Sequence, residues 1–429
     1  MRSAPSVQPG GIERKPVAVW NLDLVLITRL FGGGPRTREL DPISLVRSGA
    51  AKSALRAWWR AGNAHQFQDL QTLRKRESEL FGSPGNYDRQ GRLQGGPGAL
   101  EVTFQPGQQS RRTGVYAEPA SSPLNLAFFP AEEMGGERAT LALPGEHNLG
   151  ILSLLLRNGK PESLEGDSAA ILEGLRLWVT LGGVGSRTRR GVGAIGPKSS
   201  EAAEKLGLPT SLQELKTFLA SRCERHGVSP ALDGVFSLAR TRKVFLGRSY
   251  GSGEAAQEAL LKALKEARQS KDPRWPEANA IRWKFDPVQA AKREKPERDK
   301  NRYPRMVLGL PIVFHFKDSK YPEPPDHHLY ATTGSGEDRR KFDRYSSPIV
   351  LRPVRVWEKG RASYIPVAIF TDCLLPDTAR PLVVTDADVK AEGIDPNDII
   401  ESFEPAREAD TVLSQVEAVF ANKGFSRLL

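Results

Sequence analysis

The sequence predicts an α+β protein whose first half forms a ferredoxin-like domain with the element order βαββαβ. Three observations predict this fold class. Strand-like and helix-like segments of the first half follow that order, a loop rich in glycine and arginine comes after its second helix, and 429 residues can form two or three separate cores. We expect a disordered N-terminus over 1–16, an N-terminal domain over 17–200 and a C-terminal domain over 201–429.

Apolar spacing predicts the elements of the first half. Residues 17–27 alternate apolar and polar side chains, as a half-buried strand does. Residues 48–61 place Leu55, Trp58 and Trp59 on one face of a helix, and 70–81 is a second helix ended by glycine and proline. The remaining elements are short strands over 100–104, 124–129 and 192–195, an apolar run over 149–156 that fits a strand or a helix, and a helix over 169–181.

The second half contains fewer clear helices and a pronounced separation of charge. Residues 284–305 are dense in charge, which predicts an exposed and mobile loop inserted in the domain. Residues 372–410 hold eleven acidic against three basic residues, so we do not expect this acidic end to contact a polyanion such as RNA. The other elements are helices over 211–225 and 255–268, an amphipathic connector over 199–206, and strands over 235–246, 307–316, 349–357 and 364–370.

The charge balance favours a polyanionic partner. Lys and Arg number 62 against 51 Asp and Glu, a net charge of +11, and nucleic acid is the first candidate for such a protein. Two cysteines cannot form a disulfide framework and suit a reducing compartment. The first residues lack the apolar core of a signal peptide, and no run reaches the ~18 apolar residues of a membrane span. We therefore expect a cytoplasmic protein without membrane contact.

The loop over 182–193 contains five glycines and three arginines, with no acidic residue among them. Its segment 191–196 matches a dinucleotide fingerprint formally, but that motif must follow a strand and open a helix, which it does not do here. A simple connecting turn would explain the first glycines and leave the arginines unexplained. The composition favours a loop that grips phosphates. Its candidate groups are the guanidiniums of Arg187, Arg189 and Arg190 and the main-chain N–H groups of Gly183, Gly185 and Ser186.

This loop resembles the C-terminal glycine-rich motif of the RAMP superfamily of CRISPR proteins. The segment 39–61, with its Trp58-Trp59 helix, resembles one family of that superfamily, the first subunit of the type III-B (Cmr) RNA-guided complex. The helix end at 79–83 and the segments 275–282, 308–312 and 346–353 extend the resemblance over most of the chain. The chain departs from the family pattern at Lys52-Ser53 and at Ala57, where the family has Arg-Gly and an aromatic residue.

The resemblance implies an α+β fold of two ferredoxin-like (RRM-like, βαββαβ) domains with loop and helical insertions. It also implies a non-catalytic RNA-binding subunit at one end of a ribonucleoprotein that serves antiviral defence. Its expected partners are the distal part of the guide (CRISPR) RNA, the target RNA paired with that guide, and other RAMP subunits. No cofactor and no metal is expected. A second basic stripe of Lys52, Arg56 and Arg60 is a further candidate for RNA contact, although a solvated face opposite the tryptophans would give the same pattern. Arg47, which precedes this helix, is another candidate.

Two other functions remain open at this stage. A metal-independent endoribonuclease that processes CRISPR transcripts would need a general base, and His65 after the Trp-Trp helix is the best-placed histidine. A purely structural scaffold would use the positive charge to dock acidic neighbours. Metal chemistry has weak support, because Cys223 and His226 have ligand spacing without a second pair, and His327-His328 lies without a carboxylate cluster.

Overall fold

The computed structural model describes most of the chain. The described residues are 16–34, 39–41, 44–87, 93–107, 113–119, 121–128, 131, 139–157, 164–224, 227–232, 234–269, 275–316, 322–334, 338–342, 344–373, 375–385, 387–388 and 395–429. Residues 1–15 of the expected disordered N-terminus lie outside them. Within these ranges no helix has the length and apolar character needed to cross a membrane.

The first half of the chain forms a four-stranded antiparallel sheet. Its strands are β1 (Pro16–Leu26), β5 (Leu100–Pro106), β8 (Gly145–Arg157) and β9 (Ile195–Pro197), in the order β5-β8-β1-β9. Helices α1 (Ser48–Asn63) and α4 (Leu164–Leu181) cover one face, where Leu22 and Leu24 of β1 share a core with Trp59 and Trp178. Along the chain the order is therefore strand, helix, strand, strand, helix, strand.

The second half repeats this arrangement. Strands β10 (Thr241–Leu246), β14 (Ile349–Glu358), β15 (Arg361–Thr371) and β17 (Ser426–Arg427) form a sheet of order β14-β15-β10-β17. Helix α7 (Gly253–Arg268) follows the first strand and α10 (Pro405–Asn422) follows the third. Read across either sheet, the strands are second, third, first and fourth along the chain, so the two halves have the same topology.

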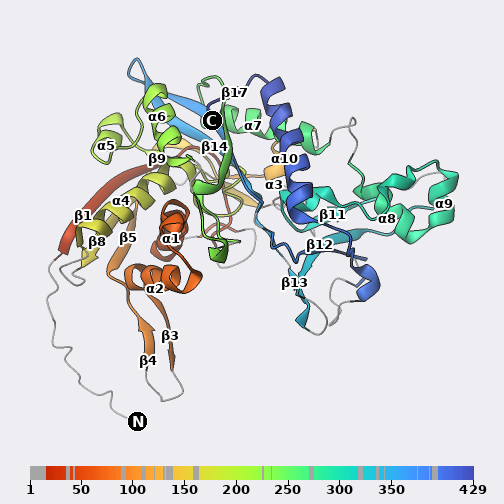
Figure 1. Ribbon diagram of the computed structural model, residues 1–429. Helices are drawn as coiled ribbons and strands as arrows, with labels where there is room; N and C mark the ends of the chain where they lie inside the picture. The colour runs from red at the N-terminus through yellow and green to blue at the C-terminus, as the bar shows by residue number, and fades with distance from the viewer. Residues whose placement is uncertain are drawn as a thin grey trace, which may run out of the picture.

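The two sheets and their helices stack as alternating layers (Figure 1). One face of the second sheet, with Val350 and Val354, shares a core with Leu177 and Leu181 of α4. Its other face, with Leu351, packs against α7 and α10. The second sheet is thus covered on both faces, whereas Val19 on the outer face of the first sheet is 54% exposed.

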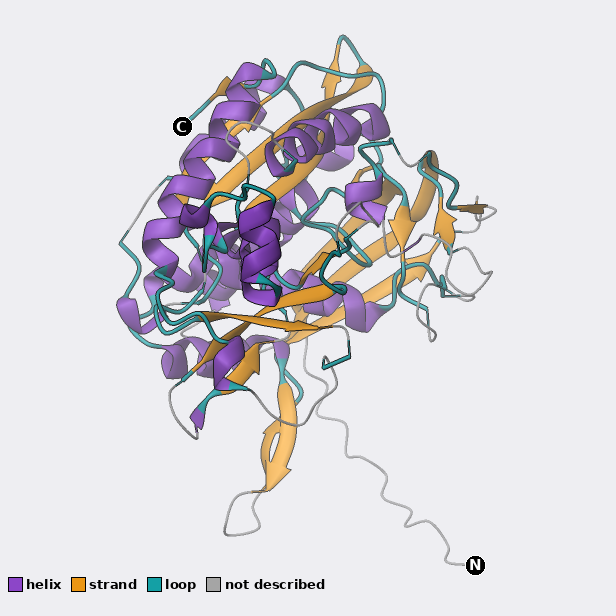
Figure 2. Cartoon of the chain, turned by 90° about the vertical axis from the view of Figure 1, so that its right-hand side faces the viewer, coloured by secondary structure: helices purple, strands orange, loops and turns teal. Residues whose placement is uncertain are grey.

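The remaining elements surround these layers, and the hairpin of β3 and β4 projects from the body in both overall views (Figures 1 and 2). They are helices α2 (Leu70–Phe81), α3 (Asn125–Phe128), α5 (Ser200–Glu204), α6 (Leu212–Arg222), α8 (Glu277–Phe285) and α9 (Pro287–Lys292), and strands β2 (Leu30–Phe31), β3 (Ser83–Tyr87), β4 (Leu93–Gly96), β6 (Thr113–Val115), β7 (Thr140–Ala142), β11 (Ile312–Phe314), β12 (His327–Thr333), β13 (Arg340–Phe342) and β16 (Arg380–Thr385).

The α+β class is confirmed, with several small sheets, and the helices expected over 48–61 and 70–81 are present. The ambiguous run 149–156 is strand β8. The strand expected over 124–129 is wrong. Short helix α3 lies there, because a single turn brings the buried Leu124 and Phe128, four residues apart, to the same core.

Two predictions for the second half also need correction. The strand expected over 235–246 begins only at Thr241, after a turn of 3₁₀ helix. The charged insertion over 284–305 is an ordered lobe rather than an exposed mobile loop. It contains α9, buries Tyr303, and is tied by Lys284 to Asp398 and by Arg293 to Glu323. The expected domain limits stay predictions.

Candidate nucleic-acid interface

The loop over 182–193 begins where α4 ends. Gly182 N donates to Trp178 O at 2.8 Å, and the Trp178 indole donates to Gly183 O at 3.0 Å, so the last turn of the helix fixes the start of the loop. The loop then folds back on itself through Val184 N to Gly193 O at 2.9 Å. Gly193 has a φ of +62°, and a Cβ there would lie 1.9 Å from Val184 O, which is why this position requires glycine.

The main chain of the loop joins both halves of the molecule. On one side Ser186 N donates to Phe31 O at 2.9 Å. On the other side Arg189 O accepts from Leu351 N of β14 at 3.0 Å, and Arg190 O accepts from the Gln257 side chain of α7 at 3.1 Å. The Ser186 N–H group already has an internal acceptor, and its contact with phosphate stays a prediction. Gly183 is buried and Gly185 is exposed, so Gly185 is the better placed of the two glycines.

The three arginines of the loop are half-buried and differ in their contacts. Arg187 Nη1 donates to Leu126 O at 3.3 Å. Arg189 donates to Ser347 O and lies over the Phe236 ring, 4.1 Å from its centroid. Arg190 Nη1 is buried without a hydrogen-bond partner in the described part of the chain. Arg189 is therefore held by structural contacts, whereas Arg190 carries an unsatisfied donor.

Burial and mutual repulsion act on this group of cations. Burial lowers the pKa of Arg187 and of Arg189 to about 10. The pKa of Arg190 is lowered further, first by burial and then by the charges of Arg268, Arg187 and Arg189. No carboxylate pairs with Arg189 or Arg190 among the described residues. Burying like charges without counter-charge is costly, so an anion beside Arg190 would be stabilising.

Arg268, at the end of α7, was missed by sequence reasoning. Burial lowers its pKa to about 10, with a smaller contribution from the charge of Arg305, which Glu277 opposes. Glu277 is itself fully buried and pairs with Arg305 at 2.9 Å, so it neutralises that residue. The anion-binding candidates are therefore Arg187, Arg190 and Arg268. No sequence signal identifies Arg268, because packing of α7 against the loop brings it there.

Arg352 of β14 is a second missed residue, and it holds the base of the loop. Its guanidinium is 1% exposed and donates to Thr180 O at 3.1 Å, to Val179 O at 2.9 Å, and to Ile195 O. The first two carbonyls belong to the last turn of α4, where a cation is favourable. Burial lowers the pKa of Arg352 to about 9. This residue positions the loop and is too deeply buried to contact a ligand.

The second basic stripe is mostly occupied by internal ion pairs. Arg56 Nε contacts Glu77 Oε1 at 2.5 Å, and Arg60 contacts both oxygens of the same carboxylate, whose residue is 1% exposed. Arg47 pairs with Asp41 at 2.5 Å. The pKa of Lys52 is lowered by burial and by the charge of Arg56. Arg56 and Arg60 therefore anchor α2 to α1, and an RNA contact by this stripe stays a prediction.

The residues considered for catalysis or metal binding belong to separate segments of the chain. His65 is half-buried in a 3₁₀ turn that follows α1. Burial raises the pKa of the Cys223 thiol to about 12, and His226 lies outside the described residues. His327 is buried with Nδ1 2.7 Å from Pro325 O, while His328 stacks on Tyr330. In the described ranges no group of three or more His, Cys, Asp or Glu side chains is arranged to hold a metal ion.

Comparison with known proteins first finds similarity to a class of protein. Residues 23–195 match the model of the RAMP superfamily, a region that ends just after the glycine–arginine loop. The predicted resemblance to the RAMP superfamily is thereby confirmed over these residues. A particular relative, the CRISPR system Cmr subunit Cmr1-1 of Pyrococcus furiosus, is 31% identical over 184 residues, which are 40% of this chain and 47% of that protein. The match thus spans about half the length of the relative.

Two solved structures are also similar. The crystal structure of Cmr1 from Pyrococcus furiosus (apo form) has a TM-score of 0.47 and 18% identity, covering 96% of this chain and 98% of that one. A subunit of the type III-B Cmr-beta complex bound to cognate target RNA, solved by cryo-EM, has a TM-score of 0.42 and 11% identity, covering 94% of this chain and 100% of that one.

Proposed function

We propose that this chain is a non-catalytic RNA-binding subunit of a type III-B CRISPR effector complex. It contacts the distal part of the guide RNA, the guide–target duplex, or both, beside other RAMP subunits in the cytoplasm. The RAMP match and the Cmr1-1 relative support the assembly. The repeated strand order of the two sheets supports two ferredoxin-like domains. One observation carries RNA binding: buried guanidiniums gather around a loop that offers Arg190 no counter-charge.

The chemistry of this cluster suits phosphate. Guanidinium groups match phosphate oxygens in geometry and stay charged at physiological pH. A phosphodiester between Arg187, Arg190 and Arg268 would supply the missing negative charge without a carboxylate, and its neighbours along the RNA would follow the same basic surface. Such contacts recognise the RNA backbone and leave sequence reading to guide–target pairing.

Charge reversal at Arg187 and Arg190, singly and together, tests the proposal. We expect weaker binding of guide or target RNA by the complex, and a salt-dependence slope lower by about 0.7–1 for each phosphate contact removed. Arg407→Glu on α10 is the matched control, because its side chain is 81% exposed and distant in sequence from the loop. Unchanged RNA retention by correctly folded loop variants would refute RNA binding at this loop.

Absence of nuclease activity needs its own experiment. The purified chain, incubated with labelled CRISPR repeat RNA, should leave that RNA intact. Specific cleavage that disappears in His65→Ala would replace our proposal with the endoribonuclease function. A scaffold without RNA contact would show RNA retention by the complex that does not change its salt slope in any loop variant.

A further inference from the structure

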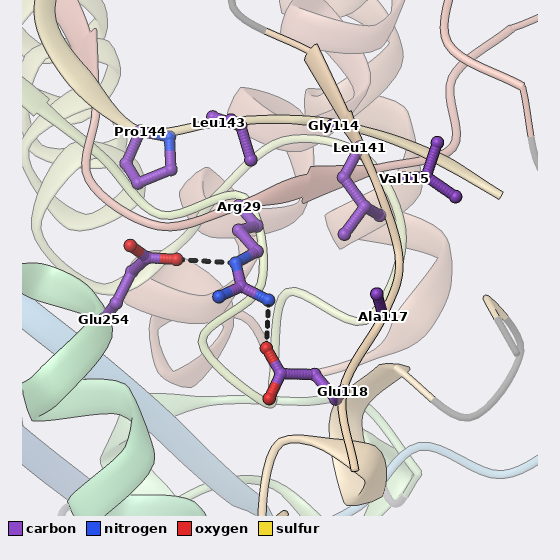
Figure 3. Close-up of a pocket in the computed structure, with 9 residues that line it drawn as sticks. All are labelled: Arg29, Gly114, Val115, Ala117, Glu118, Leu141, Leu143, Pro144 and Glu254. Atoms are coloured by element: carbon purple, nitrogen blue, oxygen red, sulfur yellow. Dashed lines mark hydrogen bonds and ion pairs between the residues drawn. The ribbon is translucent and has the colours of Figure 1, made fainter.

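A polar pocket lies beside the glycine–arginine loop and is separate from the arginine cluster. It has a volume of about 490 Å³, within the ~300–1,000 Å³ typical of small-molecule sites. Arg29 stands at its centre, after β1, with Glu118 from the segment after β6 and Glu254 from the first turn of α7 (Figure 3). Three segments far apart in the sequence therefore bring one guanidinium and two carboxylates together.

The Arg29 guanidinium, which donates hydrogen bonds, lies between the carboxylates of Glu118 and Glu254, which accept them. Arg29 Nε donates to Glu254 Oε1 at 2.6 Å, and Arg29 Nη1 donates to Glu118 Oε1. Each carboxylate uses one oxygen for Arg29, and in the described part of the chain the other oxygen accepts no hydrogen bond. Burial alone would lower the pKa of Arg29, but the two carboxylates raise it above its ordinary value. The pocket thus keeps free acceptors around a fixed cation.

Part of the pocket lining is apolar. Leu141, Leu143, Pro144 and Val115 line it above and beside the guanidinium (Figure 3). Val115 is 59% exposed, which leaves its apolar surface available to a ligand that enters from solvent. A flat, uncharged ring with hydrogen-bonding edges fits such a lining, because apolar walls contact its faces and the polar groups contact its edge.

The backbone of the pocket is continuous with the loop. Gly193 N donates to Arg29 O at 2.8 Å, and Thr28 Oγ1 donates to Gly191 O at 2.6 Å. Glu254 and Gln257 belong to the same helix, and Gln257 binds the Arg190 carbonyl. An RNA strand held at its phosphates by the loop therefore passes close to the mouth of the pocket.

We propose that this pocket receives one unpaired guanine base of the RNA, which Arg29 contacts at O6 or N7 and a carboxylate contacts at N1–H and N2–H₂. Guanine is the base with two adjacent acceptors and two adjacent donors, so it satisfies both kinds of group. A cationic side chain of a neighbouring protein is less suitable, because Arg29 already occupies the space between the carboxylates. This inference rests on the proposed RNA-binding function.

The test uses the full chain and short fluorescent oligouridylates that carry one guanine, adenine or inosine, with binding followed by anisotropy. We expect the guanine oligomer to bind about tenfold more tightly than the adenine oligomer, with inosine between them because it lacks the N2 amine. Glu118→Gln and Glu254→Gln should abolish this preference and leave the affinity for plain oligouridylate unchanged. Val115→Trp, which narrows the pocket without removing a charge, should do the same.

Variants of Arg187 and Arg190 separate this inference from the proposed function. They should weaken binding of every oligomer alike and retain the guanine preference. If the wild-type chain binds guanine and adenine oligomers equally, or if pocket variants retain the preference, the guanine pocket is refuted while RNA binding stands. If no oligomer binds, both are refuted. A pocket variant that impairs assembly with other subunits at unchanged base preference would assign the pocket to a protein neighbour and overturn the inference.

Discussion

Replacing Glu77 with glutamine tests whether the second basic stripe is structural. Glu77 is 1% exposed, and its carboxylate accepts from Arg56 Nε at 2.5 Å and from Arg60 Nε at 3.1 Å. Glutamine keeps the shape but loses the charge and turns an N–H₂ group toward a guanidinium. The two arginines then face each other without a counter-charge, so we expect Glu77→Gln to lower the free energy of unfolding.

The size of this loss follows from the exposure of the partners. Breaking a buried ion pair costs about 3–5 kcal/mol. The side chains of Arg56 and Arg60 are 32% and 38% exposed and can be rehydrated, which places the loss near the lower end, about 3 kcal/mol.

Urea unfolding followed by circular dichroism measures the loss. Glu79→Gln is the matched control, since Glu79 lies on the same helix, pairs with Arg76 at 2.8 Å, and has a side chain that is 47% exposed. We expect this control to change the free energy of unfolding by less than about 1 kcal/mol. A Glu77→Gln variant as stable as the control would refute the structural role and restore Arg56 and Arg60 as RNA-binding candidates.

Three further predictions concern the loop and its surroundings. Gly193→Ala should destabilise the chain by about 2 kcal/mol or more, since φ is +62° and the new Cβ clashes with Val184 O, whereas Gly251→Ala in open space should not, as thermal melting would show. Arg352→Met should cost about 1–3 kcal/mol in urea unfolding and weaken RNA binding, because it removes the donors that hold the base of the loop; unchanged values would contradict this. Burial raises the pKa of the Cys223 thiol from its ordinary 9.0 to about 12 in the folded chain, so the thiol contributes stability below pH 9 that is lost as pH rises toward 12. In urea unfolding, Cys223→Ala should remove this part of the loss of stability at alkaline pH.

Sequence periodicity predicted the helices and strands in which the spacing of the apolar side chains determines the buried face. Strand β1 corresponds to the alternation in 17–27, and helix α1 corresponds to the spacing of Leu55, Trp58 and Trp59. Apolar side chains of both elements pack in the same core. The strand prediction for 124–129 was wrong because the apolar pattern of six residues does not distinguish one helical turn from a strand. The apolar run 149–156 was resolved only by its pairing with β1 and β5.

Ionic partners could not be predicted because they are distant along the chain. Arg56 and Glu77 are 21 residues apart, and Lys284 and Asp398 are 114 apart. From the sequence the first looked like a free basic stripe and the second like part of a solvated charged loop. The glycine–arginine loop follows helix α4, as the sequence predicts. The burial of its arginines and the approach of Arg268 could not be predicted, because they depend on how α7 packs.

The hydrogen bonds that tie the loop to β14 and α7 couple ligand occupancy to the docking of the two halves. Arg189 O and Arg190 O contact the second half, while Ser186 N contacts the first, so a ligand held by the loop sits at their joint. Linkage requires reciprocity: the proposed RNA ligand at this joint would favour the docked arrangement to the same degree that docking favours RNA. At 100 times its dissociation constant a ligand adds about 2.7 kcal/mol, so RNA should raise the melting temperature of both halves together.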